Sequence, residues 1–193
     1  MKLNPEYVKV ASKMIDESPY LKLLGTTTEL LDAGHYRCRM ELDRKHTNMF
    51  GGINGGVNAG LLDSVTYWCL LCCMPEDVGY TTIDLTVNDM HSAKSGIIYA
   101  EGEVIKHGRT ISLTEGRITD EKGTLIAYGT SKLFASPTIQ PMSLAAEYLD
   151  VYKRQCIRRS FATARQVLSC GHLAGRALRS CRAIFLARFA HYA

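Results

Sequence analysis

The sequence predicts an α+β fold in which one antiparallel sheet wraps around a long central helix. Apolar residues recur at three- and four-residue steps in two segments, whereas six others alternate apolar and polar residues. The order is one helix, two strands, a long helix and four strands. Strands joined by successive hairpins after a central apolar helix favour a single sheet packed on that helix.

The element boundaries follow from these periods and from the glycines and prolines between them. In chain order they are a helix over 5–18, an apolar connection over 20–24, strands over 26–32 and 34–42, a helix over 55–73, and strands over 80–90, 97–106, 110–119 and 124–134. In the strand at 80–90, Ile83, Leu85 and Val87 are expected on one face, with Thr82 on the other.

The chain is organised around a polar, glycine-rich loop that leads into the long helix. Glycines are costly in backbone entropy, so this segment needs unusual dihedrals or a group lying close to the main chain. A helix that begins near Gly55 presents unpaired N–H groups and a partial positive charge. Such an end suits an anion or a polarised carbonyl oxygen.

Asp63 is the one acidic residue in that helix, about two turns from its start. It is flanked by Leu61, Leu62 and Val65, where an ionised carboxylate is costly unless it is paired or faces a cleft. We therefore expect Asp63 to lie in a functional site, facing the amino-terminal mouth of a glycine-started helix across the boundary between two subunits.

Asn48, the run Asn54-Gly55-Gly56 and then Asp63 form a spaced motif. The motif resembles that of the hotdog-fold acyl-CoA thioesterases of the PaaI-like, phenylacetate-pathway type, which have Asn, His-Gly-Gly and an acidic residue at this spacing. Asn54 departs from the pattern, because the family has His there. An amide donates a hydrogen bond but carries no charge.

The resemblance covers the order of elements over residues 5–136 and implies a hotdog domain over 1–137. It implies hydrolysis of an aryl- or medium-chain acyl-CoA by a homodimer or homotetramer, with each active site at a subunit boundary. Two alternatives stay open: an acyl-CoA binding or regulatory domain that has lost turnover, and a hotdog hydratase. Trp68 counts against the hydratase, because the MaoC-like type has His at that place.

The implied roles follow the motif. Gly55 and Gly56 would donate backbone N–H groups to the thioester oxygen, and Asp63 would act as general base or as nucleophile. Asn48 would orient the water, and Thr82 would reach the site from the second subunit. Structural alternatives are an Asx turn for Asn48, close helix packing for the glycines and an ordinary strand position for Thr82.

Coenzyme A enters only as part of the substrate, and no other cofactor or metal is expected. Lys94, Lys106, His107 and Arg109 lie in turns that would reach its phosphates. His46 precedes the glycine loop without a Ser or Cys partner, so it is expected either at the surface or as a brace for the loop.

Composition narrows the remaining possibilities. All 19 acidic residues precede residue 151, so the net charge of +4 comes from the tail and gives no reason to expect nucleic-acid binding. The seven cysteines lack metal spacing and are expected as small apolar residues of a reducing cytoplasm. There is no apolar leader and no run long enough to span a membrane.

Residues 138–193 form a basic, weakly periodic tail with no family counterpart. A solvated or disordered extension and a translated run-on of non-coding DNA are the two main interpretations. A basic amphipathic helix is a third. No chemistry is assigned to this tail.

Overall fold

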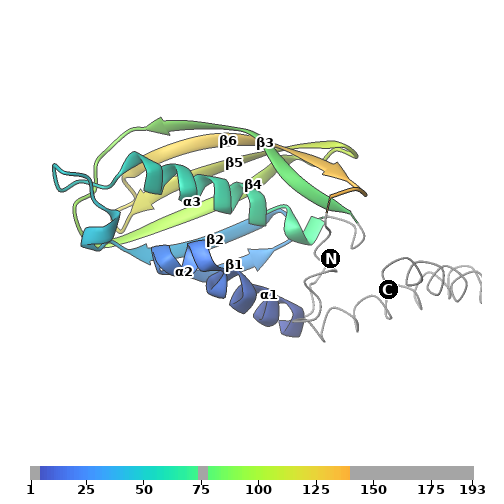
Figure 1. The fold of residues 1–193 in the computed structure, drawn as a ribbon, viewed down its shortest axis with the longest axis horizontal. Coiled ribbons are helices and arrows are strands. Elements are labelled where there is room, and N and C mark those ends of the chain that lie inside the picture. Colours follow the sequence, from blue (N-terminus) through green and yellow to red (C-terminus); the bar gives the residue numbers. More distant parts are fainter. Residues whose placement is uncertain (1–4, 74–77, 140–193) are drawn as a thin grey trace, which may run out of the picture. The chain divides into compact units, whose positions relative to one another are not determined.

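The computed structural model of the chain describes residues 5–73 and 78–139, and Figure 1 shows their arrangement. The elements are α1 (Pro5–Glu17), α2 (Pro19–Leu24), β1 (Thr26–Asp32), β2 (His35–Glu41), η1 (Arg44–His46), α3 (Gly55–Trp68), η2 (Leu71–Cys73), β3 (Gly79–Asp89), β4 (Ile97–Lys106), β5 (Ile111–Asp120) and β6 (Leu125–Ser136). The α+β class and the order of strands agree with the sequence prediction. Residues 140–193, with most of the predicted tail, lie outside the described residues.

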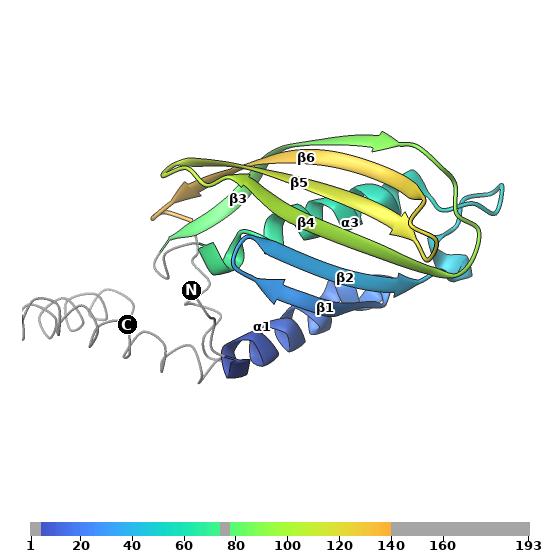
Figure 2. The ribbon, with the colours of Figure 1, turned by 180° about the vertical axis from the view of Figure 1, so that it is seen from behind.

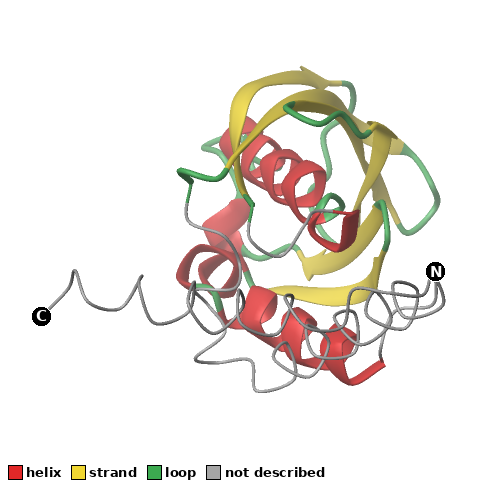
Figure 3. Cartoon of the chain, turned by 90° about the vertical axis from the view of Figure 1, so that its right-hand side faces the viewer, coloured by secondary structure: helices red, strands yellow, loops and turns green. Residues whose placement is uncertain are grey.

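All six strands form one antiparallel sheet in the order β1-β2-β4-β5-β6-β3. Figure 2 shows this order from the outer side of the sheet. Viewed nearly along α3, the sheet curves around the helix (Figure 3). The central helix is therefore covered by the sheet on one side, and α1 and α2 lie near the β1 edge. Within the described residues, no helix is long and apolar enough to cross a membrane.

Three glycines in register across the sheet allow α3 to lie close to it. Gly102, Gly116 and Gly129 pair directly with one another on β4, β5 and β6. A Cβ at Gly102 would lie 2.2 Å from the carbonyl oxygen of Val65, and one at Gly116 would contact side chains of α3 at 3.0–3.1 Å. The apolar side of α3 thus packs on bare backbone, with Leu62 and Val65 fully buried.

Two elements differ from the sequence prediction by more than one or two residues at their ends. The apolar connection at 20–24 is part of the short helix α2, which has Pro19 at its start and ends at Gly25 with φ +76°. Such a six-residue helix is too short to show a period in sequence. The long helix ends at Trp68 rather than at residue 73, and the buried run continues into η2.

Helix α1 is held on the sheet edge by one carboxylate. Asp16 Oδ1 accepts hydrogen bonds from the Thr28 amide at 2.8 Å and from the Thr28 hydroxyl at 2.7 Å. The same hydroxyl lies 3.0 Å from the hydroxyl of Tyr36, which is fully buried and whose pKa is raised by that burial. Asp16 therefore satisfies the polar groups of β1 beneath the helix.

Asp16→Ala is expected to lower the free energy of unfolding by about 1–3 kcal/mol, because it leaves the part-buried Thr28 amide without a partner. Urea denaturation measures this loss. Glu17→Ala on the same helix is the control, since Glu17 makes only an exposed 3.8 Å ion pair with Lys13 and should change stability by less than about 0.5 kcal/mol. Equal losses in the two variants would contradict the assigned role of Asp16.

Candidate active site

The glycine-rich loop before α3 is ordered by Asn48. The Asn48 side-chain oxygen accepts hydrogen bonds from the amides of Phe50 at 2.9 Å and Gly52 at 3.3 Å, and its NH₂ group donates to the Ile53 carbonyl at 3.4 Å. This is the Asx turn that the sequence left open as an alternative. The contact of Asn48 with a water or a substrate stays a prediction.

His46 braces the base of the same loop. It is 1 % exposed. Its Nδ1 accepts from the Asp43 amide at 2.9 Å, and its Nε2 lies 2.7 Å from the Leu24 carbonyl oxygen. An Nδ1 that accepts leaves the proton on Nε2, which donates to that carbonyl. The expectation that His46 braces the loop is therefore confirmed.

The start of α3 has two hydrogen-bond donors without a partner among the described residues, and only one of them belongs to the predicted pair. Asn54 is the N-cap residue, and its side-chain oxygen accepts from the Gly56 amide at 2.8 Å. The Gly56 N–H is thus occupied, contrary to the prediction. The Gly55 N–H and the Asn54 NH₂ group make no hydrogen bond within the described residues, and both residues are exposed. Asn at this position follows the N-cap preference of helices.

Asp63 is exposed on the chain described here, not enclosed by apolar residues as expected. Its Oδ1 accepts a hydrogen bond from the Thr82 hydroxyl at 3.0 Å. No hydrogen bond to its Oδ2 is made within the described residues. One carboxylate oxygen is therefore held by a hydroxyl while the other remains available to a water or a substrate.

Thr82 reaches Asp63 within the same chain, and its predicted approach to the site of a second subunit stays a prediction. The pairing of β3 with β6 shifts between Thr82 and Asp84, so Ile83 is an extra residue in a β-bulge. Ile83 is 54 % exposed, whereas Thr82 and Leu85 are half-buried. Because of the bulge, Thr82 lies on the face of β3 that is turned toward α3. Regular alternation had placed Ile83 on that face.

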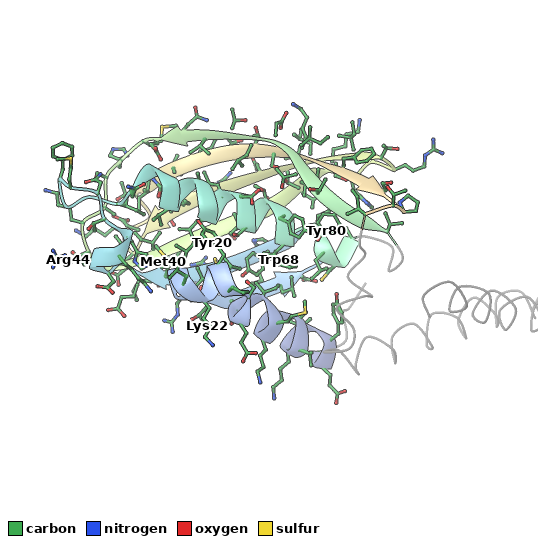
Figure 4. The ribbon with its side chains drawn as sticks, viewed as in Figure 1. Tyr20, Lys22, Met40, Arg44, Trp68 and Tyr80 are labelled. Atoms are coloured by element: carbon green, nitrogen blue, oxygen red, sulfur yellow. The ribbon has the colours of Figure 1, made fainter. Side chains whose placement is uncertain are left out.

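An aromatic cluster lies one turn beyond Asp63. The rings of Tyr67 and Tyr80 are 4.4 Å apart, and Tyr67 lies edge-on to Trp68 at 5.0 Å. Burial raises the pKa of Tyr67, and the negative charge of the nearby Asp63 carboxylate raises it further. Figure 4 shows Trp68 and Tyr80 at the end of the molecule where α3 finishes, with Arg44 at the opposite end.

The two chemical groups of the predicted site, the Gly55 N–H and the Asp63 carboxylate, are far apart in one chain. Gly55 and Asp63 are separated by eight residues of α3, a rise of about 12 Å. A thioester is a few atoms across, so its carbonyl oxygen and its reacting carbon cannot contact both groups of the same helix. Asp63 therefore does not reach the mouth of its own helix, and its predicted approach to the helix start of a second subunit stays a prediction.

The four basic residues predicted to hold coenzyme A do not gather in one place. Lys94 precedes β4, whereas Lys106 is its last residue and His107 and Arg109 follow it. The ten residues of β4 separate them by roughly 33 Å. Lys94 lies at the glycine-loop end, where the Ala93 carbonyl accepts from the Ile53 amide at 2.7 Å. Only Lys94 is therefore placed near the start of α3.

The cysteines of the described residues are free thiols; Cys38 and Cys69 are buried, as expected of small core residues, whereas Cys72 and Cys73 are half-buried. Burial raises the pKa of both Cys38 and Cys72 to about 12, so these thiols stay neutral. One group within residues 5–73 and 78–139 has metal-ligand chemistry: His35, Glu101 and Glu103 on β2 and β4. There His35 Nε2 already pairs with Glu101 at 2.5 Å.

Two residues near the start of α3 were not singled out from the sequence. Asn58 is 2 % exposed and donates a hydrogen bond at 2.7 Å to Asp89, the last residue of β3. A polar Asn between apolar helix residues was the signal that could have indicated a partner across the fold. Its partner lies 31 residues away, so the sequence could not identify Asp89.

Comparison with known proteins agrees with this architecture. A family model described as "Thioesterase superfamily" matches residues 50–127. Acyl-coenzyme A thioesterase 13 of Homo sapiens is 32 % identical over 124 residues, which cover 63 % of this chain and 88 % of the relative. The chain belongs to the thioesterase superfamily.

Solved structures show the same fold. A thioesterase from Haemophilus influenzae superposes with a TM-score of 0.63 at 19 % identity, covering 70 % of this chain and 92 % of its own. Zebra fish Thioesterase Superfamily Member 2 gives a TM-score of 0.61 at 25 % identity, over 69 % and 99 % of the two chains. The domain is a hotdog fold, as the motif had suggested.

Proposed function

We propose that this chain hydrolyses the thioester of an acyl-CoA to a free acid and coenzyme A, as a PaaI-like enzyme. The observation that carries the proposal is the Asp63 carboxylate, exposed on the central helix, with Oδ1 held by Thr82 at 3.0 Å and no hydrogen bond to Oδ2 from any described residue. The name of the human relative, an acyl-coenzyme A thioesterase, supports the same chemistry.

The reaction needs a nucleophile for the carbonyl carbon and donors for its oxygen. In one route Asp63 takes a proton from a water, which adds to the carbon; the C–S bond then breaks and the thiolate of coenzyme A takes up a proton. In the other, Asp63 attacks directly, the C–S bond breaks and the released thiolate takes up a proton, and a water then cleaves the resulting anhydride to the free acid and the Asp63 carboxylate. The Thr82 hydrogen bond fixes the carboxylate direction in either route.

The complete site is proposed to form between two copies of the chain. The 12 Å or so between Gly55 and Asp63 on one helix requires that the donors and the carboxylate acting on one thioester come from different copies. β3 is an edge strand of 11 residues that, in the described part of the chain, pairs only with β6. An unpaired edge of this length favours pairing with another strand.

The register of that pairing follows from the contacts of β3 with α3. Thr82 contacts Asp63, and Asp89 lies beside Gly55. An antiparallel pair of β3 strands with its twofold axis near Leu85 would place residue 82 of one copy close to residue 89 of the other. The carboxylate of one copy would then approach the helix start of the second. Dimers of such dimers give the proposed homotetramer.

The oxyanion donors in this scheme are the Gly55 N–H and the Asn54 NH₂ group, since the Gly56 N–H is engaged by the cap. Asn48 acts by shaping the loop that precedes them. Lys94 is the one proposed phosphate contact at this end of the fold. The acyl group is proposed to be aryl or medium-chain, packed against Tyr67 and Trp68, and the free thiols suit a cytoplasmic location.

Thiol release from phenylacetyl-, benzoyl- and medium-chain acyl-CoA, followed with a thiol reagent, tests the function. Saturable turnover of at least one of them is expected. Saturable binding of acyl-CoA without release would instead support the binding module, the alternative that Asn54 keeps open. Many turnovers with excess substrate in ¹⁸O-labelled water separate the two routes, because label accumulates in the Asp63 carboxylate only if Asp63 attacks directly and water then adds to the Asp63 carbonyl of the anhydride.

Thr82→Val is expected to lower kcat about tenfold, because it removes a hydrogen bond to a charged group and keeps the shape of the side chain. Thr82→Ser keeps the hydroxyl and should retain most of the activity. Steady-state kinetics of the two variants, with circular dichroism as a check on folding, makes the comparison. A Val variant as active as the Ser variant would remove the hydroxyl from the mechanism.

A further inference from the structure

Asp89 connects the end of β3 to the first turn of α3. Its Oδ1 accepts the hydrogen bond from Asn58 Nδ2 at 2.7 Å. Its Oδ2 lies 3.0 Å from the position that a Cβ on Gly55 would take. The carboxylate thus occupies the space beside Gly55 and touches the helix one turn further on.

Asn58 depends on Asp89 for its side-chain hydrogen bonding. Its side chain is almost fully buried, and Oδ1 has no hydrogen-bond partner among the described residues. The bond to Asp89 is the one side-chain hydrogen bond that Asn58 makes there. Loss of Asp89 would leave a whole buried amide unpaired, which the first turn of α3 can relieve only by moving.

We propose that Asp89 is a positioning residue, which fixes the first turn of α3 through Asn58 and so sets the direction of the Gly55 N–H. This inference rests on the proposed function, in which that N–H faces the thioester oxygen. The loop amides cannot do the same, because Asn48 holds the segment 48–53 and not the helix itself.

The hydrogen bond, and not the negative charge, is the useful property of Asp89. A carboxylate beside Gly55 opposes the negative charge that develops on the thioester oxygen. An Asn at this position would accept the same bond from Asn58 without that charge. Asp89→Asn should therefore keep or raise kcat, whereas Asp89→Ala should lower it about tenfold with KM changed less than about threefold.

A double-mutant cycle tests the connection through Asn58. Asn58→Ala is expected to lower kcat like Asp89→Ala, and the double variant should lose no more than either single variant. Asp32→Ala is the matched control, since Asp32 ends β1, outside the proposed β3 interface, and its Oδ1 accepts only from the neighbouring Ala33 amide, at 2.7 Å, among the described residues. Its kcat should stay within about twofold of the wild type. Additive losses, or equal losses in Asp89→Ala and Asp89→Asn, would overturn the proposal.

Amide hydrogen exchange gives a readout that does not require turnover. Asp89→Ala should speed exchange in residues 57–60 severalfold, while Asp89→Asn should leave it near the wild-type rate. Unchanged exchange in the Ala variant would overturn the inference whether or not the enzyme hydrolyses acyl-CoA. Altered exchange in a protein with no turnover would leave the positioning in place and refute the proposed function alone.

Discussion

Asp63→Ala is expected to lower kcat for acyl-CoA hydrolysis at least about a hundredfold, the usual scale for removing a general base. Asp63 is exposed and its side chain makes one hydrogen bond, to Thr82. Its removal should therefore leave the thermal midpoint nearly unchanged. Thiol-release kinetics measures the loss, and size-exclusion chromatography verifies that the assembly is retained.

Asp63→Asn is the matched control for shape. It keeps the size of the side chain and a bond with Thr82 but cannot take up a proton or attack the carbonyl. Both variants should lose activity to a similar extent. Wild-type rates in either one would remove Asp63 from the mechanism and leave the exposed carboxylate as an ordinary surface group.

Gly102→Ala is expected to lower the free energy of unfolding by about 3 kcal/mol or more, at the upper end of the range for overpacking. The new Cβ would meet the Val65 carbonyl oxygen at 2.2 Å. That atom belongs to helix backbone, so it cannot yield as a side chain could. Chemical denaturation of the purified variant gives the free energy directly.

Gly116→Ala, the neighbouring glycine in the same row, provides the comparison. Its Cβ would meet side chains of Leu62, Val65 and Thr66 at 3.0–3.1 Å, and these can adjust by a few tenths of an ångström. The expected loss is nearer 1 kcal/mol. If both variants were equally stable, α3 would have room to move off the sheet, and the close approach at Gly102 would not be a constraint.

The element order could be predicted from sequence because each element carries its own period. The start of α3 at Gly55 followed from the glycines, and the alternating residues of β2 placed Tyr36 and Met40 in the core, where both are buried. Helix α2 was missed because six residues show too little of a period to distinguish a helix from an apolar connection.

The candidate site was only partly predictable, because its residues meet through tertiary structure. The bulge at Ile83 has no local signature, so regular alternation turned Thr82 the wrong way. The apolar neighbours of Asp63 in sequence lie on another side of the helix, which explains why an exposed residue was expected to be buried. Lys94 and Lys106 were grouped by their place in turns, although a full strand separates them.

The extra residue at Ile83 also affects how relatives are to be aligned with this chain. Some homologues will lack the extra residue in the edge strand. In such a homologue, the residue whose hydroxyl contacts the acid that corresponds to Asp63 would lie one position away from the residue that a gap-free alignment pairs with Thr82. A Ser or Thr at that neighbouring position would then be the functional counterpart of Thr82. The alignment would show a missing hydroxyl, although only the length of the strand has changed.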